Sequence, residues 1–189
     1  MLVIGAAFYL VAGAIGRGEI RLTGLDPQSA QGDRAVVEIL RDMGADIRWE
    51  GSALVSRASR LHGLRVDCAQ IPDLVPILAV AMAAAEGDSR ITGAARLRIK
   101  ESDRLSAMAA ALTAAGADAA ELPDGLAIRG GKTLHAAKIE GCNDHRIVMA
   151  MTIASALSDG EWTITDAEAT AKSAPAFWQE FERLGGRTR

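Results

Sequence analysis

The sequence predicts an α/β fold with helices inside and sheets outside, built from repeated units. Two observations predict it: a short pattern that occurs three times, and the apolar or amphipathic character of the segments around it. The pattern is Gly, an acidic residue and a β-type run ending in Thr followed by Gly or Asp. Its copies are "GEIRLTG" (18–24), "GDSRITG" (87–93) and "GEWTITD" (160–166), with starts 69 and 73 residues apart. Periods of this length indicate a small α/β unit rather than a solenoid turn.

A helix-like segment precedes each copy of the pattern. The segment "LVPILAVAMAAA" (74–85) is apolar nearly all round, which is typical of a buried helix. The stretch "MLVIGAAFYLVAGAI" (1–15) has the apolar run of a signal peptide, but no basic n-region and no clear small-residue cleavage site. It is also short for a bilayer span, so we interpret it as a buried core helix. The expected helices cover 4–15, 73–86 and 145–158.

A second helix-like segment follows each copy. In the middle copy Leu105, Met108, Ala109 and Leu112 have the i, i+3, i+4, i+7 spacing of an amphipathic helix. Each of these segments ends in a small or Gly-rich stop: "MGA" (43–45), "AGA" (115–117) and "LGG" (184–186). Strands are expected after the first two stops, near 46–50 and 53–57 around Gly51, and near 118–121 and 126–129 around the turn "PDG" (123–125).

The expected units span 4–60, 73–131 and 145–186. No low-complexity linker separates them, so a single domain over residues 1–189 is the economical interpretation. No strand precedes the first unit, and the third unit stops after its helix. We therefore expect the chain to be a piece of a longer protein.

The composition disfavours several classes of function. A formal net charge of −3 implies no general attraction to nucleic acid, and the aromatic residues, 4% of the chain, do not interleave with basic ones. Cys68 and Cys142 form no CxxC arrangement and are expected to be free thiols in a reducing cytosol. No metal-ligand cluster and no dinucleotide or P-loop fingerprint is visible. Two isolated histidines are expected to be exposed and three tryptophans to serve packing: His62, His135, Trp49, Trp162 and Trp178.

Basic residues recur where helices are expected to begin. "KESDR" (100–104) places Lys100 and Arg104 four residues apart at the front of a helix. "NDHR" (143–146) places His145 and Arg146 in a first turn, after Asn143 or Asp144 as N-cap. "AKSAP" (171–175) places Lys172 just before Ser173, an expected N-cap, with Pro175 in the first turn. A cation there faces the positive end of the helix dipole and costs a few tenths to about 1 kcal/mol.

A solvated helix face with an incidental like-charge pair is the simpler interpretation of "KESDR". Because the placement recurs in different units, we favour a bound anion that makes it favourable, since helix N-termini and Arg both recognise phosphate and carboxylate. Carboxylates are interleaved with the cations: Glu101 lies between Lys100 and Arg104, and Asp73 lies at the entrance of the 73–86 helix. Such a carboxylate is an ion-pair partner or, beside a bound anionic substrate, a general acid or base.

These segments resemble the 5-enolpyruvylshikimate-3-phosphate synthase family. The resemblance rests on "IPD" (71–73), "LRIKESDRL" (97–105), "NDHRIVMA" (143–150) and "TAKSAPAFW" (170–178), in the family's order and spacing. It implies an enolpyruvyl transferase fold of repeated βαβαββ units in an inverse α/β barrel-like domain. The family has two such domains with substrates in the cleft between them, and this chain resembles the C-terminal one. The N-terminal domain of the family is then a partner of this chain.

The resemblance also implies roles for single residues. Asp73 resembles the carboxylate that contacts the shikimate hydroxyls and acts as base at the 5-hydroxyl, and Glu101 resembles the residue that handles the proton at C3 of phosphoenolpyruvate. Lys100 resembles a lysine beside the 5-hydroxyl. Further substrate-binding positions are implied: Arg104 and Arg146 clamp the phosphoenolpyruvate carboxylate, Lys172 lies near its phosphate, and His145 neighbours that pocket. Arg96 stands where many members carry Asn.

The activity implied is transfer of the enolpyruvyl group from phosphoenolpyruvate to shikimate 3-phosphate with release of phosphate, a step of aromatic amino acid biosynthesis. It needs no cofactor and no metal, and it implies a cytoplasmic protein without nucleic-acid or membrane partners. This chain is expected to supply one wall of the cleft and to be inactive alone, with homodimerisation through the exposed cleft face as an artefact. Two alternatives stay open: an enolpyruvyl transferase acting on UDP-N-acetylglucosamine, and a non-catalytic anion-binding domain.

Overall fold

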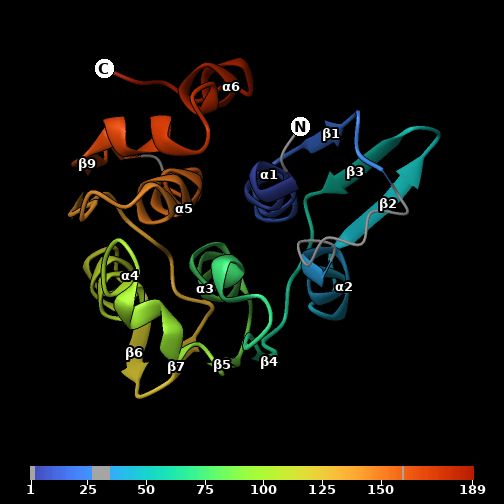
Figure 1. Ribbon diagram of the computed structural model, residues 1–189. Coiled ribbons are helices and arrows are strands. Elements are labelled where there is room, and N and C mark those ends of the chain that lie inside the picture. Colours follow the sequence, from blue (N-terminus) through green and yellow to red (C-terminus); the bar gives the residue numbers. More distant parts are fainter. Residues whose placement is uncertain (1–2, 27–34, 159) are drawn as a thin grey trace.

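A computed structural model describes residues 3–26, 35–158 and 160–189. Helices α1 (Val3–Ile15), α3 (Val75–Ala84) and α5 (His145–Ser155) contact one another in the middle of the molecule, and the strands lie outside them (Figure 1). Every residue of α3 from Val75 to Ala83 is buried. A helix that is apolar all round is stable only in such surroundings, so the expectation of helices inside and sheets outside is confirmed.

Helix α1 is a core helix, as the sequence predicted. The side chains of Phe8, Leu10 and Val11 are buried, and the hydroxyl of Ser56 on the neighbouring sheet donates to the Leu10 carbonyl at 2.7 Å. Within the described part of the chain, every helix is too short or too polar to cross a membrane.

The first sheet consists of β1 (Glu19–Leu22), β2 (Asp46–Glu50) and β3 (Ala53–Arg57) in the order β1-β3-β2, all antiparallel. Helix α2 (Ala35–Asp42) buries Val36 and Leu40 beside it. The last two strands match the expected ranges, because the hairpin between them turns at Gly51, whose φ is +60°.

The second sheet consists of β4 (Arg65–Asp67), β5 (Asp88–Thr92), β6 (Asp118–Leu122) and β7 (Gly125–Arg129) in the order β4-β5-β7-β6. Strand β4 pairs parallel with β5, and the other pairs are antiparallel. Helix α4 (Arg104–Ala114) packs on β6 and β7. Its four predicted core positions are all buried, which confirms the amphipathic pattern: Leu105, Met108, Ala109 and Leu112.

The third group pairs β8 (Lys138–Ile139) parallel with β9 (Thr163–Ile164). A 3₁₀ segment, η4 (Ala167–Lys172), and helix α6 (Phe177–Arg183) follow and lie together at one end of the molecule (Figure 1). The sequence pattern did not reveal β4 and β8, which precede α3 and α5. Runs of three and two residues are too short to show an alternating pattern.

The predicted helix stops all use one device. Gly44, Gly116 and Gly185 have φ values of +96°, +93° and +99°, which only glycine adopts without strain. After each of them the next amide closes a bond back to the helix, from Ala45 to Leu40, from Ala117 to Leu112 and from Gly186 to Phe181. These are Schellman caps, and they explain the small or Gly-rich stops that end these segments.

Candidate active site

Arg104 lies at the centre of the candidate site. Its side chain is 1% exposed, although it belongs to the first turn of α4. Its Nε donates to Oδ2 of Asp144 at 2.7 Å, Nη1 donates to Oδ1 of Asp73 at 3.1 Å, and Nη2 donates to Oε2 of Glu101 at 2.6 Å. One guanidinium therefore joins the 3₁₀ segment η2 (Pro72–Leu74), the segment before α4 and the start of α5.

Asp144 is a site residue that sequence reasoning treated only as a possible N-cap. Its side chain is fully buried, and it accepts hydrogen bonds from Arg104, from the Ser102 hydroxyl at 2.9 Å and from the Arg146 amide at 3.0 Å. Burial raises the pKa of this carboxyl, but the Arg104 guanidinium and the other donors outweigh it and hold the pKa below its usual value. Asp144 is thus a charged anchor for Arg104 as well as the N-cap of α5.

Arg146 and Arg104 both bind the carboxylate of Asp73. Its Nη2 lies 3.0 Å from Oδ2 of Asp73, and its Nη1 donates to the Asp73 carbonyl at 2.9 Å. The Asp73 carboxylate therefore bridges two buried arginines while 39% of its side chain stays exposed. Both guanidinium groups consequently lie directly beneath a carboxylate that solvent reaches.

His145 is the first residue of α5 and is buried. Its Nδ1 is buried without a hydrogen-bond partner in the described structure and lies 3.8 Å from Oε1 of Glu101. Burial lowers the pKa of His145, and the neighbouring Arg146 lowers it further, while Asp144 opposes the shift. The imidazole is therefore held neutral, with an unused nitrogen facing Glu101.

Lys100 does not belong to the helix that follows it, contrary to the sequence expectation. It caps the 3₁₀ segment η3 (Ala95–Ile99) in extended conformation, and α4 begins four residues later. The α4 N-cap is Asp103, whose Oδ1 accepts from the Ser106 amide at 3.1 Å. Lys100 is exposed, and no hydrogen bond or ion pair is recorded for its ammonium in the part of the chain described here.

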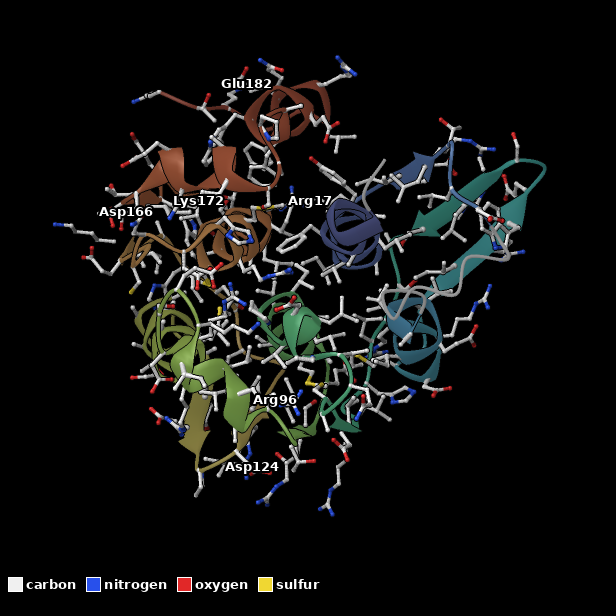
Figure 2. The ribbon with its side chains drawn as sticks, in the orientation of Figure 1. Arg17, Arg96, Asp124, Asp166, Lys172 and Glu182 are labelled. Carbon is white, nitrogen blue, oxygen red and sulfur yellow. The ribbon has the colours of Figure 1, made fainter. Side chains whose placement is uncertain are left out.

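Lys172 reaches the start of α5 from η4. Its Nζ donates to the carbonyl and the side-chain oxygen of Asn143 at 2.8 and 2.9 Å, and the Asn143 amide donates to Asp166 at 3.0 Å. Figure 2 shows Lys172 and Asp166 on this segment beside α5. The expected N-cap at Ser173 is wrong: α6 begins at Phe177 after Ala176.

The backbone is strained in the loop that enters α5 and at the residue before η4. Cys142, Asn143 and Asp166 have φ values of +53°, +50° and +57°, in the left-handed region that non-glycine residues seldom adopt. Strain of this kind, about 1–3 kcal/mol per residue, persists where surrounding contacts fix it. Here the bonds from Lys172 and Asp166 to Asn143 supply those contacts.

The two arginines at the helix starts are compensated by carboxylates within the chain, so their placement alone gives no evidence of a bound anion. Carboxylates of Asp73, Glu101 and Asp144 satisfy Arg104, and Asp73 also satisfies Arg146. An incoming carboxylate can still replace Asp73 or Glu101, because both side chains are about 40% exposed. Chemically, the arrangement offers two guanidinium groups for an anion and two reachable carboxylates for proton transfer.

The remaining expectations concern residues away from the site. Both cysteines are free thiols, and burial raises the pKa of Cys68 to about 12. His62 and His135 are exposed, and the three tryptophans pack against the core. Among the described residues, no group of three His, Cys, Asp or Glu side chains is placed to hold a metal ion.

Comparisons with known proteins agree on one family. Residues 3–181 match the family described as EPSP synthase (3-phosphoshikimate 1-carboxyvinyltransferase). Curated proteins named 3-phosphoshikimate 1-carboxyvinyltransferase from Clostridium acetobutylicum and Clostridium novyi are 46% and 45% identical over 96% and 95% of this chain. A solved EPSP synthase from Acinetobacter baumannii superposes with a TM-score of 0.81 at 34% identity, over 96% of this chain and 45% of that one.

The two relatives are longer proteins, and the chain spans 42% and 41% of their lengths. The family match nevertheless covers the helix core, both larger sheets and the whole cluster around Arg104. The chain belongs to the EPSP synthase family and has the α/β fold of that family.

Proposed function

We propose that this chain forms one wall of an active site that transfers the enolpyruvyl group of phosphoenolpyruvate to the 5-hydroxyl of shikimate 3-phosphate. The observation that carries the proposal is the convergence of Arg104 and Arg146 on the carboxylate of Asp73, with Glu101 and His145 alongside. Family membership supports it, because the relatives are named for this transfer.

Arg104 and Arg146 would bind the phosphoenolpyruvate carboxylate. They now share Asp73, so substrate binding exchanges one carboxylate for another rather than burying a new charge. Such an exchange avoids most of the desolvation cost of several kcal/mol that an ion entering a dry pocket meets. The displaced Asp73 is then free to accept a proton.

Glu101 would protonate C3 of the enol phosphate, which leaves an oxocarbenium-like centre at C2. The 5-hydroxyl attacks this centre and gives up its proton to Asp73. The attack forms a tetrahedral ketal phosphate. The phosphate then leaves with the proton held by Asp73, and one C3 proton returns to the Glu101 carboxylate, which gives the enol ether. Each proton transfer contributes about 10²- to 10⁴-fold in rate.

The other polar groups would position the substrates and support Glu101. Lys100, exposed beside Glu101, would contact the 5-hydroxyl, and Lys172 would lie near the phosphate of phosphoenolpyruvate. His145, held neutral beside Glu101, would support that carboxyl in its proton transfer. None of these steps requires a cofactor or a metal.

We further propose one domain of three repeat units, with the second wall of the cleft supplied by the part of the family protein that this chain does not span. Clamping both substrates between two walls contributes up to about 7–11 kcal/mol to the barrier reduction, so one wall alone is expected to be inactive. We also propose a cytoplasmic location, and the net charge of −3 argues against nucleic-acid partners. Self-association through the cleft face would be a by-product of the missing wall.

The choice of acceptor tests the proposal. The chain is mixed with the separately expressed remaining part of a relative, and phosphate release from phosphoenolpyruvate is followed with shikimate 3-phosphate or with UDP-N-acetylglucosamine. Release with shikimate 3-phosphate alone supports the proposal. Release only with the sugar nucleotide would assign the chain to the other enolpyruvyl transferase reaction, and phosphate binding without turnover would leave an anion-binding domain.

A further inference from the structure

Arg98 connects the second sheet to the segment that carries Glu101 and Arg104. Its Nε donates to the Pro123 carbonyl at 3.0 Å and its Nη2 donates to the Leu122 carbonyl at 2.7 Å. Leu122 is the last residue of β6, and Pro123 is the first residue of the turn between β6 and β7. Its Nη1 donates to Oε1 of Glu121 at 2.6 Å and to Oδ2 of Asp103 at 2.9 Å. Four hydrogen bonds thus leave this side chain little freedom.

The hydrogen bond to Asp103 links the fixed Arg98 side chain to the candidate site. Asp103 is the N-cap of α4, and while Oδ2 accepts from Arg98, its Oδ1 accepts from the Ser106 amide. The next residue is Arg104, the centre of the cluster. Arg98 therefore holds Asp103, the residue that directly precedes Arg104.

The same turn also holds the beginning of the segment. The Gly93 amide donates to Oδ2 of Asp124 at 3.0 Å, and the Ala94 amide donates to the Asp124 carbonyl at 2.7 Å. Figure 2 shows Asp124 at the tip of the hairpin and Arg96 on the neighbouring 3₁₀ segment. Gly93, Ala94 and the Arg98 side chain are thus attached to one hairpin, and Arg98 in turn bonds Asp103 at the end of the segment.

Arg57 on the first sheet provides a comparison. Its side chain is 29% exposed, as is that of Arg98, and it pairs with Glu19 at 3.0 Å and with Glu50 at 2.6 Å. These are bonds between side chains on the outer face of a sheet. Arg98 differs because half of its bonds go to backbone carbonyls of a hairpin and one goes to a helix cap.

We propose that Arg98 is a positioning residue for enolpyruvyl transfer, and that the β6–β7 turn is the support that sets where Glu101 and Arg104 lie. This inference rests on the proposed function. Among the described residues, Arg98 donates to the β6–β7 hairpin and to the N-cap Asp103, so it acts through Asp103 and Arg104 rather than on substrate.

The test compares Arg98→Met with the matched control Arg57→Met. In the ¹⁵N-labelled chain, hydrogen exchange is measured at the Arg104 Nε–H and at the Ser106 amide, with Arg104→Lys identifying the first signal. We expect exchange at both groups to rise at least tenfold in Arg98→Met and to change less than twofold in Arg57→Met. In the chain completed by the remaining part of a relative, kcat/KM for phosphoenolpyruvate should fall at least tenfold only in Arg98→Met.

Arg98→Lys refines the test, because lysine keeps the charge beside Glu121 but lacks the fork that reaches both carbonyls. We expect it to restore less than half of the lost kcat/KM. If Arg98→Met fails to fold, Glu121→Ala removes one bond only, and exchange at Arg104 should still rise about threefold. Exchange and kcat/KM within twofold of Arg57→Met would overturn the proposal. Absence of turnover in every sample, the unaltered chain included, would refute the proposed function, while the exchange data would still decide the role of Arg98.

Discussion

Replacing Asp144 with asparagine removes the charge of a fully buried carboxylate and nearly keeps its shape. Asparagine is as good an N-cap as aspartate, so the bond from the Arg146 amide can remain. The Arg104 guanidinium is 1% exposed. In the variant its Nε faces a neutral amide, either the NH₂ group, which cannot accept, or the oxygen, which accepts more weakly than a carboxylate. Its remaining counter-ions are the half-exposed Asp73 and Glu101.

The expected loss of stability follows from this burial. Removing one partner of a buried ion pair typically costs about 3–5 kcal/mol, because the other charge stays in the low-dielectric interior. The two bonds from Arg104 and the one from Ser102 account for a cost of this size, since hydrogen bonds to charged groups contribute about 1.5–3 kcal/mol each and are not additive. We therefore expect Asp144→Asn to cost about 3–5 kcal/mol.

Urea unfolding followed by tryptophan fluorescence measures this loss. With a slope of about 2 kcal/mol/M, the midpoint should fall by about 1.5–2.5 M. The pH dependence gives a second readout. Because the pKa of Asp144 is lower in the folded chain, its contribution is present above the unfolded value of about 3.9 and is lost as the pH falls through the folded value. The stability of Asp144→Asn should therefore fall less steeply with decreasing pH in this range than that of the unaltered chain.

Asp88→Asn is the matched control, because Asp88 pairs with Arg129 at 3.0 Å with both side chains largely exposed. Its midpoint should hardly change, as exposed ion pairs contribute little. A shift for Asp144→Asn as small as that of the control would refute the assignment of Asp144 as the buried anchor of Arg104.

Three further predictions concern the same site and the thiols. In the completed enzyme, Glu101→Gln should lower kcat by about 10²- to 10⁴-fold in a phosphate-release assay, and unchanged kcat would remove Glu101 from proton transfer. Because burial lowers the pKa of His145, the unfolded chain binds that proton more readily, so urea midpoints should fall as the pH drops below about 6.5. This fall should be absent in His145→Gln, and equal slopes would contradict the buried neutral imidazole. A thiol reagent should modify Cys142 in the folded chain but Cys68 only after unfolding, and fast labelling of both would contradict the burial of Cys68.

Much of the fold was predictable because its signals are local. The apolar run of α3 and the spacing of Leu105 and Leu112 each reflect one helix face, and the three Gly stops reflect the left-handed φ that a Schellman cap requires. Strands β4 and β8 were not predicted, because they are short and form only through parallel pairing with β5 and β9. Pairing between distant segments leaves no periodic trace in so few residues.

The site was predictable in part. The structure brings Asp73, Glu101, Arg104 and Arg146 together, while their catalytic roles stay predictions. Asp144 looked like a simple N-cap, because nothing local indicates that its second oxygen binds a buried arginine 40 residues away. The role of Arg98 could not be predicted for the same reason, since its carbonyl partners Leu122 and Pro123 are distant from it in the sequence.

We propose that this chain supplies catalytic groups to enolpyruvyl transfer without being sufficient for it. Phosphate release from phosphoenolpyruvate and shikimate 3-phosphate is measured in three samples: the chain, the remaining part of a relative, and their mixture. We expect release in the mixture alone, and its loss when the chain carries Glu101→Gln. No release from a mixture of two folded parts, or equal release with and without the chain, would refute this proposal.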